Sequence, residues 1–194
     1  MKSKSIMLLV CAFALALSVG YAGAITTTPG PDTLKVDYFA NANTAGAPDA
    51  TVRITNPGTA GGSLCADIFV FDANQEMSEC GACYVSPDGL RTLSVNTDLT
   101  GNPLTGVTLS TGAIKIVSTP TKNGVCPLPD FPLNPVAGIR SWATHIQNAN
   151  FAITETPSQD ATFSAAEVQR LQAQCYAIWL DGSGKGILTC GTGD

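Results

Sequence analysis

The chain has 194 residues, of which 44% are hydrophobic and only 13% charged, and its formal net charge is −5 at pH 7. The negative sign and low charge content argue against nucleic acid or an anionic membrane surface as a partner. A chain of this length buries enough surface to form a core without covalent help. Its seven cysteines therefore need a separate explanation.

The N-terminus has the pattern of an export signal. Residues 1–4 are basic, residues 6–19 are an almost unbroken apolar run, and residues 22–24 are small. This pattern predicts a signal peptide over residues 1–24, cleaved after Ala24. The apolar run is too short to span a bilayer and no second one follows. We therefore expect a secreted protein without membrane insertion, located in the extracellular space, at the cell surface or in the periplasm.

The cysteines predict a disulfide framework. Removing residues 1–24 leaves 170 residues and six cysteines and, with Lys2 and Lys4 gone, changes the formal charge to −7. An even number of cysteines in an oxidising compartment predicts three disulfides. They are Cys65, Cys80, Cys83, Cys126, Cys175 and Cys190. We expect Cys175 to pair with Cys190, Cys65 with Cys80 or Cys83, and Cys126 with the one that remains.

Residues 25–48 are rich in Pro, Gly, Asn and Ala, and this composition predicts a flexible leader with one strand at residues 33–39. Leu34, Val36 and Tyr38 alternate there with polar residues, as in a sheet with one face in water. Such a strand pairs either within its own domain or with a neighbouring molecule. These three residues are therefore candidates for assembly by strand addition.

The remaining residues, 49–194, are expected to form a single β-rich domain. Its predicted strands cover residues 50–55, 64–71, 90–95, 112–118, 139–147 and 151–156. Residues 64–84 are expected to form a disulfide-linked β-hairpin, whose turn at residues 72–75 places Cys65 opposite position 82. Turn signals recur about every 10 to 15 residues, which favours a sandwich over βαβ units. We predict a disulfide-stabilised antiparallel β-sandwich, immunoglobulin-like or related.

The C-terminal part changes to a helical period and predicts one helix over residues 165–180. Ser164 and Glu167 have the spacing of a capping box, in which each side chain bonds the other residue's backbone amide. Val168, Leu171 and Ile178 then recur on one side of the helix. This apolar stripe is expected to pack on the sheet.

No residue combination indicates a catalytic centre. Cys80 and Cys83 have the spacing of a redox motif, but a strand and turn follow them rather than the required helix, so structural disulfides are favoured. A zinc site that adds Cys126 or His145 lacks a second closely spaced pair. His145 is the only histidine. It falls on the strand face opposite Trp142 and is expected to be exposed.

Carboxylates gather near the predicted hairpin, and they are Asp67, Asp72, Glu76 and Glu79. Catalysis by a carboxylate pair would require two of them to converge across a cleft. Asp72, Asn74 and Glu76 also begin a calcium pattern, and residues 181–187 resemble the start of a calcium loop. In the second segment, however, Lys185 stands where an oxygen ligand belongs. We therefore predict no metal and no cofactor.

Two functions are compatible with these features. The first is a non-catalytic exported structural or interaction protein, acting in adhesion, matrix or assembly, whose partner is another protein or a second copy of itself. The alternative is a secreted carbohydrate-binding module or acid-catalysed hydrolase that uses the carboxylates above. Aromatic side chains would support glycan binding if they were exposed in a row, although both tryptophans are expected in the core. These are Tyr84, Trp142, Tyr176 and Trp179.

Overall fold

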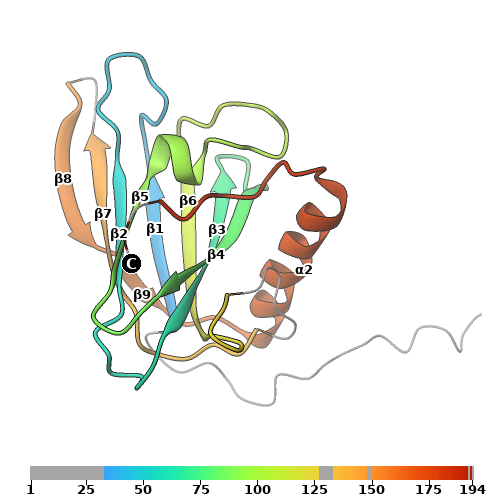
Figure 1. Cartoon of the computed structure of the whole chain (residues 1–194). Helices are drawn as coiled ribbons and strands as arrows, with labels where there is room; N and C mark the ends of the chain where they lie inside the picture. The colour runs from blue at the N-terminus through green and yellow to red at the C-terminus, as the bar shows by residue number, and fades with distance from the viewer. Residues whose placement is uncertain (1–32, 127–132, 148–149, 192, 194) are drawn as a thin grey trace, which may run out of the picture.

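The computed structural model describes residues 33–126, 133–147, 150–191 and 193. The predicted signal peptide and the first residues of the predicted leader lie outside the described residues. Within the described part, two antiparallel sheets pack face to face, and one helix covers the outer side of the larger sheet (Figure 1). This arrangement confirms the prediction of a mainly β protein with one C-terminal helix and three disulfides.

The first sheet contains five strands in the order β4-β3-β6-β1-β9. Their bounds are Leu34–Phe39 for β1, Leu64–Asp72 for β3, Met77–Val85 for β4, Gly112–Pro120 for β6 and Gln159–Ala161 for β9. Both faces of this sheet are covered. On β3, Ile68 and Val70 face the second sheet, whereas Phe69 and Phe71 face the helix. A strand alternates its side chains between two faces, so covering both faces requires the near-continuous apolar sequence of β3.

The second sheet contains four strands in the order β5-β2-β7-β8. Their bounds are Thr51–Thr55 for β2, Leu90–Ser94 for β5, Arg140–Gln147 for β7 and Ala152–Pro157 for β8. A short π-helical turn, η1 (Val95–Leu99), follows β5. Val52 and Ile54 of β2 are buried against the first sheet, and their strand neighbours are partly exposed. This alternation is the one expected from the sequence of residues 50–55.

The helix α2 (Ala165–Asp181) begins where the capping pattern predicts. Ser164 Oγ accepts a hydrogen bond from the backbone N–H of Glu167 at 3.2 Å. The second half of the predicted capping box differs, because the Glu167 carboxylate bonds Arg170 and Lys115 of β6 instead of returning to Ser164. The stripe that includes Val168 and Leu171 packs on the first sheet.

Residues 33–39 belong to the domain rather than to a leader. β1 pairs with β6 over its whole length and with β9 from Leu34 to Val36. It is therefore an interior strand, already paired on both sides. Leu34 is buried and Val36 packs against the same cluster, but Tyr38 is 49% exposed. The prediction that this strand is available for addition to another molecule is not supported by this pairing.

Candidate functional site

All six cysteines of the described chain form disulfides, but in a different pairing from the expected one. The bonds join Cys65 to Cys126, Cys80 to Cys175, and Cys83 to Cys190. The expected Cys175–Cys190 bond is wrong because each of these residues reaches β4 instead of the other. No thiol among these six is left to bind a metal or act as a nucleophile.

The two cysteines of the redox-like motif cannot pair with each other because they lie three residues apart on one strand. An odd spacing on a strand places side chains on opposite faces. Cys80 faces the helix and bonds Cys175 of α2, whereas Cys83 faces the core between the sheets and bonds Cys190. The motif therefore fastens two different C-terminal elements to β4.

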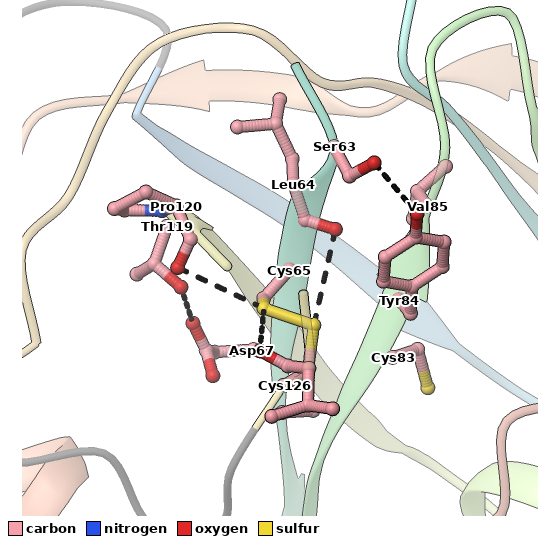
Figure 2. Close-up of a disulfide and its surroundings, with 12 residues drawn as sticks. Ser63, Leu64, Cys65, Asp67, Cys83, Tyr84, Val85, Thr119, Pro120 and Cys126 are labelled. Carbon is pink, nitrogen blue, oxygen red and sulfur yellow. Dashed lines mark hydrogen bonds between the residues drawn. A yellow bond between two sulfur atoms is a disulfide. The ribbon is translucent and has the colours of Figure 1, made fainter. Parts of the chain in front are cut away.

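The register of the β3–β4 hairpin explains why Cys65 does not bond β4. Cys65 lies opposite Tyr84, two residues from the expected position 82, because the turn is one residue longer than expected and a β-bulge beside Val70 and Phe71 adds a second residue. Cys83 then projects from the face opposite to that of Cys65. Figure 2 shows the resulting bond from Cys65 to Cys126, with the Cys83 sulfur set apart from it.

The buried carboxyl groups near the hairpin do not converge. Asp67 lies on the helix side of the first sheet, where its Oδ2 accepts a hydrogen bond from Thr119 Oγ1 at 2.6 Å. Glu79 pairs across the ladder with Val70 and shares that residue's face, toward the second sheet. Because they project from opposite faces of one sheet, Asp67 and Glu79 cannot act as an acid–base pair.

The Asp72 side chain has a local structural role. Its Oδ1 accepts hydrogen bonds from the backbone N–H groups of Asn74 and Glu76, both at 2.9 Å. This is the geometry by which an aspartate closes a turn. Within the described ranges, no group of three or more His, Cys, Asp or Glu side chains is arranged to hold a metal ion.

Glu79 has the most perturbed carboxyl group in this region. Its side chain is fully buried, and Oε1 accepts a hydrogen bond from the backbone N–H of Asn102 at 3.0 Å, whereas Oε2 has no partner. Burial raises the pKa of Glu79 to about 7, and the bond from Asn102 opposes this shift. A raised pKa is typical of a catalytic acid, but a fully buried group cannot contact a substrate.

His145 is buried, contrary to the prediction that it is exposed. Its ring stacks on Tyr38 with centroids 4.2 Å apart, and its Nε2 lies 2.9 Å from Thr156 Oγ1 and 3.4 Å from Asp37 Oδ1. The hydroxyl of Ser158, which lies between β8 and β9, donates a hydrogen bond to Asp37 Oδ2. A catalytic triad requires the hydroxyl and the carboxylate to bond different ring nitrogens, and here both face Nε2.

The aromatic side chains do not form a single row. Trp179 is 50% exposed and Tyr176 is 39% exposed, so the expectation that Trp179 lies in the core is wrong. Their rings stack with centroids 6.0 Å apart on α2. Trp142 is half-buried on β7, and the Tyr84 hydroxyl bonds Ser63 Oγ on the first sheet (Figure 2).

The C-terminal segment (residues 182–191) covers two sheet edges. Along β4, Cys80 N–H donates to Gly186 O at 2.8 Å, and Leu188 N–H donates to Cys80 O at 3.1 Å. Beside β5, the backbones approach so closely that a Cβ on Gly191 would lie 2.2 Å from Thr92 O. Residues 181–187, which resemble the start of a calcium loop, thus lead into the segment that covers the edge of β4.

The exposed edge of the second sheet is β8. All six of its residues are exposed, and Figure 1 shows β8 as the outermost strand of its sheet. The edge strands of the two sheets are β4, β9, β5 and β8, and β9 has only three residues. Among the four edge strands of the two sheets, β8 is therefore the longest one that the described chain leaves open. An open edge presents unpaired backbone groups to which another strand can add.

The backbone groups that β8 presents outward follow from its register. Ser158 N–H donates to Ser141 O at 3.0 Å and continues the β7–β8 ladder. Inward and outward groups alternate along an antiparallel strand. The outward groups therefore belong to Ile153, Glu155 and Pro157. Proline lacks an N–H, so the outward donors of β8 are Ile153 and Glu155.

Comparisons with known proteins identify no relative. No family model matches the chain, and neither the curated proteins nor the solved structures contain a match. The helix of the described chain is not long and apolar enough to cross a membrane.

Proposed function

We propose that the protein is an exported, non-catalytic interaction module in which two copies join through β8. The observation that carries the proposal is the fully exposed edge of β8, in a domain whose other edges are covered or short. The buried or locally bonded carboxyls and the bonded cysteines add no catalytic group. Partner recognition is the function that this geometry supports best.

Two copies of β8 are self-complementary in one antiparallel register. When Thr154 of one copy lies opposite Thr154 of the other, Ile153 of each copy lies opposite Glu155 of the second copy. Every outward N–H of Ile153 and Glu155 then faces an outward carbonyl. This register also keeps the two Glu155 side chains from lying opposite each other. Arg53 of β2 already pairs with Glu155 on the surface of the second sheet.

Export is supported by two independent features. The first is the basic, apolar and small-residue pattern of residues 1–24, and the second is the three disulfides, which are typical of oxidising compartments. These features support our proposal that the protein acts outside the cytoplasm, in the extracellular space, at the cell surface or in the periplasm. N-terminal sequencing of the exported protein should begin at Ile25.

The strand order supports an immunoglobulin-like sandwich with exchanged terminal strands. In that fold one sheet has the order C′-C-F-G, and the other contains A-B-E. Here β4-β3-β6-β1 and β7-β2-β5 occupy corresponding positions. The N-terminal strand β1 thus stands where the last strand G is expected, and β7 stands in place of A. A fold of this class is used for many functions, so it does not identify the partner.

Substitutions at Ile153 test the β8 contact and its register. Ile153 is 60% exposed, so replacing it should leave the fold intact. In the proposed register, Ile153→Glu places two glutamates opposite each other at both ends of the contact and should yield monomers. Ile153→Lys places a lysine opposite Glu155 of the second copy and should strengthen the dimer. Sedimentation equilibrium of residues 25–194, folded with the disulfides intact, measures both effects.

The matched control is Val107→Glu, which adds the same charge at an exposed loop residue away from β8. It should dimerise like the unmodified protein. A wild-type protein that stays monomeric at millimolar concentration would refute the proposal. Equal dimerisation of the Ile153→Glu and Ile153→Lys variants would refute the register.

The exposed pair of Tyr176 and Trp179 supports carbohydrate binding as a second candidate. Aromatic rings at the surface can pack against the apolar face of a sugar. A glycan array with the unmodified protein and with Trp179→Ala tests this function, which requires a signal that the substitution abolishes. The hydrolase alternative receives no comparable support, because Asp67 and Glu79 face opposite sides of their sheet, and Asp72 closes the turn through two backbone hydrogen bonds.

A further inference from the structure

A groove of about 500 Å³ lies at the C-terminal half of α2, between the β3–β4 turn and the loop that follows η1. Its volume is in the range of sites that bind small ligands. The residues that line it are Asp72, Gln75, Glu76, Met77, Ser78, Leu104, Thr105, Gln174, Ala177, Ile178, Asp181 and Gly182. None of these belongs to β8, so the groove is independent of the proposed dimer contact.

The groove combines apolar and acidic side chains. Met77, Leu104 and Ile178 provide apolar surface, and Asp72, Glu76 and Asp181 provide three carboxylates. None of the described lining residues is a lysine, an arginine or a histidine. The groove therefore favours a ligand that has an apolar stem and a positive charge.

The end of α2 strengthens this preference. The backbone dipoles of a helix place a partial negative charge at its C-terminus, where basic side chains are stabilising. The last turn of α2 contains no basic residue, and Asp181 adds a negative charge there. A cation bound in the groove would offset both charges.

Ser78 supplies an independent sign of a missing partner. The bulge of the β3–β4 ladder pairs Met77 with Phe71 and Glu79 with Val70, which leaves Ser78 as the extra residue. Ser78 lines the groove and is only 5% exposed, and its Oγ has no hydrogen-bond partner. Its carbonyl oxygen accepts a hydrogen bond from Leu104 N–H, so the hydroxyl alone is left over. Buried hydroxyls normally have a partner.

We propose that this groove binds the side chain of a lysine presented by a peptide segment of a partner protein. The methylene stem of the lysine packs on Met77, Leu104 and Ile178. Its ammonium group, which has three hydrogen-bond donors, lies among the carboxylates at the end of α2. Ser78 Oγ bonds a polar group of the bound segment. Arginine fits less well, because no aromatic ring lines the groove for a guanidinium to stack on.

Calorimetric titration with the acetylated and amidated tripeptide Ala-Lys-Ala tests the proposal, and Ala-Gln-Ala serves as the uncharged comparison. We expect saturable binding of the lysine peptide alone, weakening as salt is added. Glu76→Gln and Asp181→Asn should each weaken binding by up to about fivefold, as expected for partly exposed ion pairs. Ser78→Ala should weaken it by a similar factor through loss of one hydrogen bond.

Asp88→Asn is the matched charge control. Asp88 is an exposed turn residue outside the groove with φ 61°, a conformation that asparagine also tolerates. This variant should bind Ala-Lys-Ala as the unmodified protein does. Equal binding of the two peptides, no saturable binding at millimolar peptide, or equal weakening by Asp88→Asn and Asp181→Asn would overturn the proposal. Because dimerisation is measured separately, a failure here leaves the β8 contact unaffected.

Discussion

Cys80 of β4 is bonded to Cys175 of α2, and this bond joins the helix to the first sheet across 95 residues of sequence. The neighbouring Cys83 projects from the other face of β4 and bonds Cys190. Two residues of one strand thus secure the helix on one side and the C-terminal segment on the other. The redox-like spacing is explained by this double attachment.

Removing the Cys80–Cys175 bond should therefore loosen α2 selectively. We expect the double variant Cys80→Ala with Cys175→Ala to lose about 2 to 5 kcal/mol of unfolding free energy. Amide hydrogen exchange should accelerate throughout α2, because apolar packing and non-covalent polar contacts such as the Lys115–Glu167 pair are then all that attach it to the sheet. The comparison is the double variant Cys65→Ala with Cys126→Ala. It should destabilise the protein, but amide exchange in α2 should not accelerate more than exchange in the rest of the domain. Unchanged protection of α2 in the first variant would contradict this role.

The strands and the helix of this fold follow from local sequence patterns. The contacts and disulfides between segments that are distant in sequence do not. Alternation along residues 50–55 and the cap at Ser164 predicted β2 and the start of α2. The register of the β3–β4 hairpin depended on a longer turn and on a bulge beside Val70, and no residue near the turn indicates either of them. Leu34, Val36 and Tyr38 had a strand pattern, but the many Pro, Gly, Asn and Ala residues around them suggested a flexible leader. Their place between β6 and β9 depends on residues far along the chain.

Glu79 should make the protein less stable as the pH rises toward neutrality. Burial raises its pKa from 4.5 to about 7 in the folded state. Below about pH 4.5 the carboxyl is protonated in both states, and its full contribution to stability is present. As the pH rises to about 7 the unfolded chain releases its proton first, so up to about 3 kcal/mol is lost.

Glu79→Gln keeps an oxygen that can accept the hydrogen bond from Asn102 but removes the titration. Its unfolding free energy should lack the decrease between about pH 4.5 and 7 that Glu79 causes. The control Glu76→Gln, at an exposed turn residue, should retain that decrease. Urea unfolding at a series of pH values provides the measurement. A Glu79→Gln profile parallel to that of the unmodified protein would count against the raised pKa.

Side-chain environments were harder to predict than strands. Lys35 and Asp37 were assigned to a face of their strand that lies in water, yet both are buried, because their ladder partners Ile116 and Ile114 face the core between the two sheets. His145 of β7 is buried where it meets Asp37 and Tyr38 of β1. The exposed edge of β8 was also missed, since exposure of both strand faces leaves no alternation to detect. The composition of residues 152–157 alone carries no sign of it.

Glu167 should have the opposite pH dependence to Glu79. Hydrogen bonds from Arg170, aided by Lys115, lower its pKa to about 2 despite partial burial. Its contribution to stability is therefore present above about pH 4.5 and is lost as the pH falls toward 2. Glu167→Gln should cost about 1 kcal/mol at pH 7 and almost nothing near pH 2. Glu155→Gln, which removes the more exposed pair with Arg53, should have a smaller effect at pH 7.

The contact between Gly81 and Leu188 should control whether the C-terminal segment stays on β4. A Cβ at position 81 would lie 2.4 Å from Leu188 Cγ, so Gly81→Ala forces these elements apart. We expect a loss of about 1 to 3 kcal/mol, with faster exchange of the Cys80 and Leu188 amide protons, which hold the segment to the strand. Gly62→Ala, where a Cβ meets nothing within 4 Å, is the matched control.

A double-mutant cycle separates this steric cause from a general weakness of β4. Leu188→Ala alone removes buried apolar surface and should destabilise the protein by about 2 to 5 kcal/mol. In the double variant the shorter side chain at position 188 leaves room for the new methyl group at position 81. The combined loss should therefore be smaller than the sum of the two single losses. Strict additivity in urea unfolding would show that Gly81 is required for a reason other than contact with Leu188.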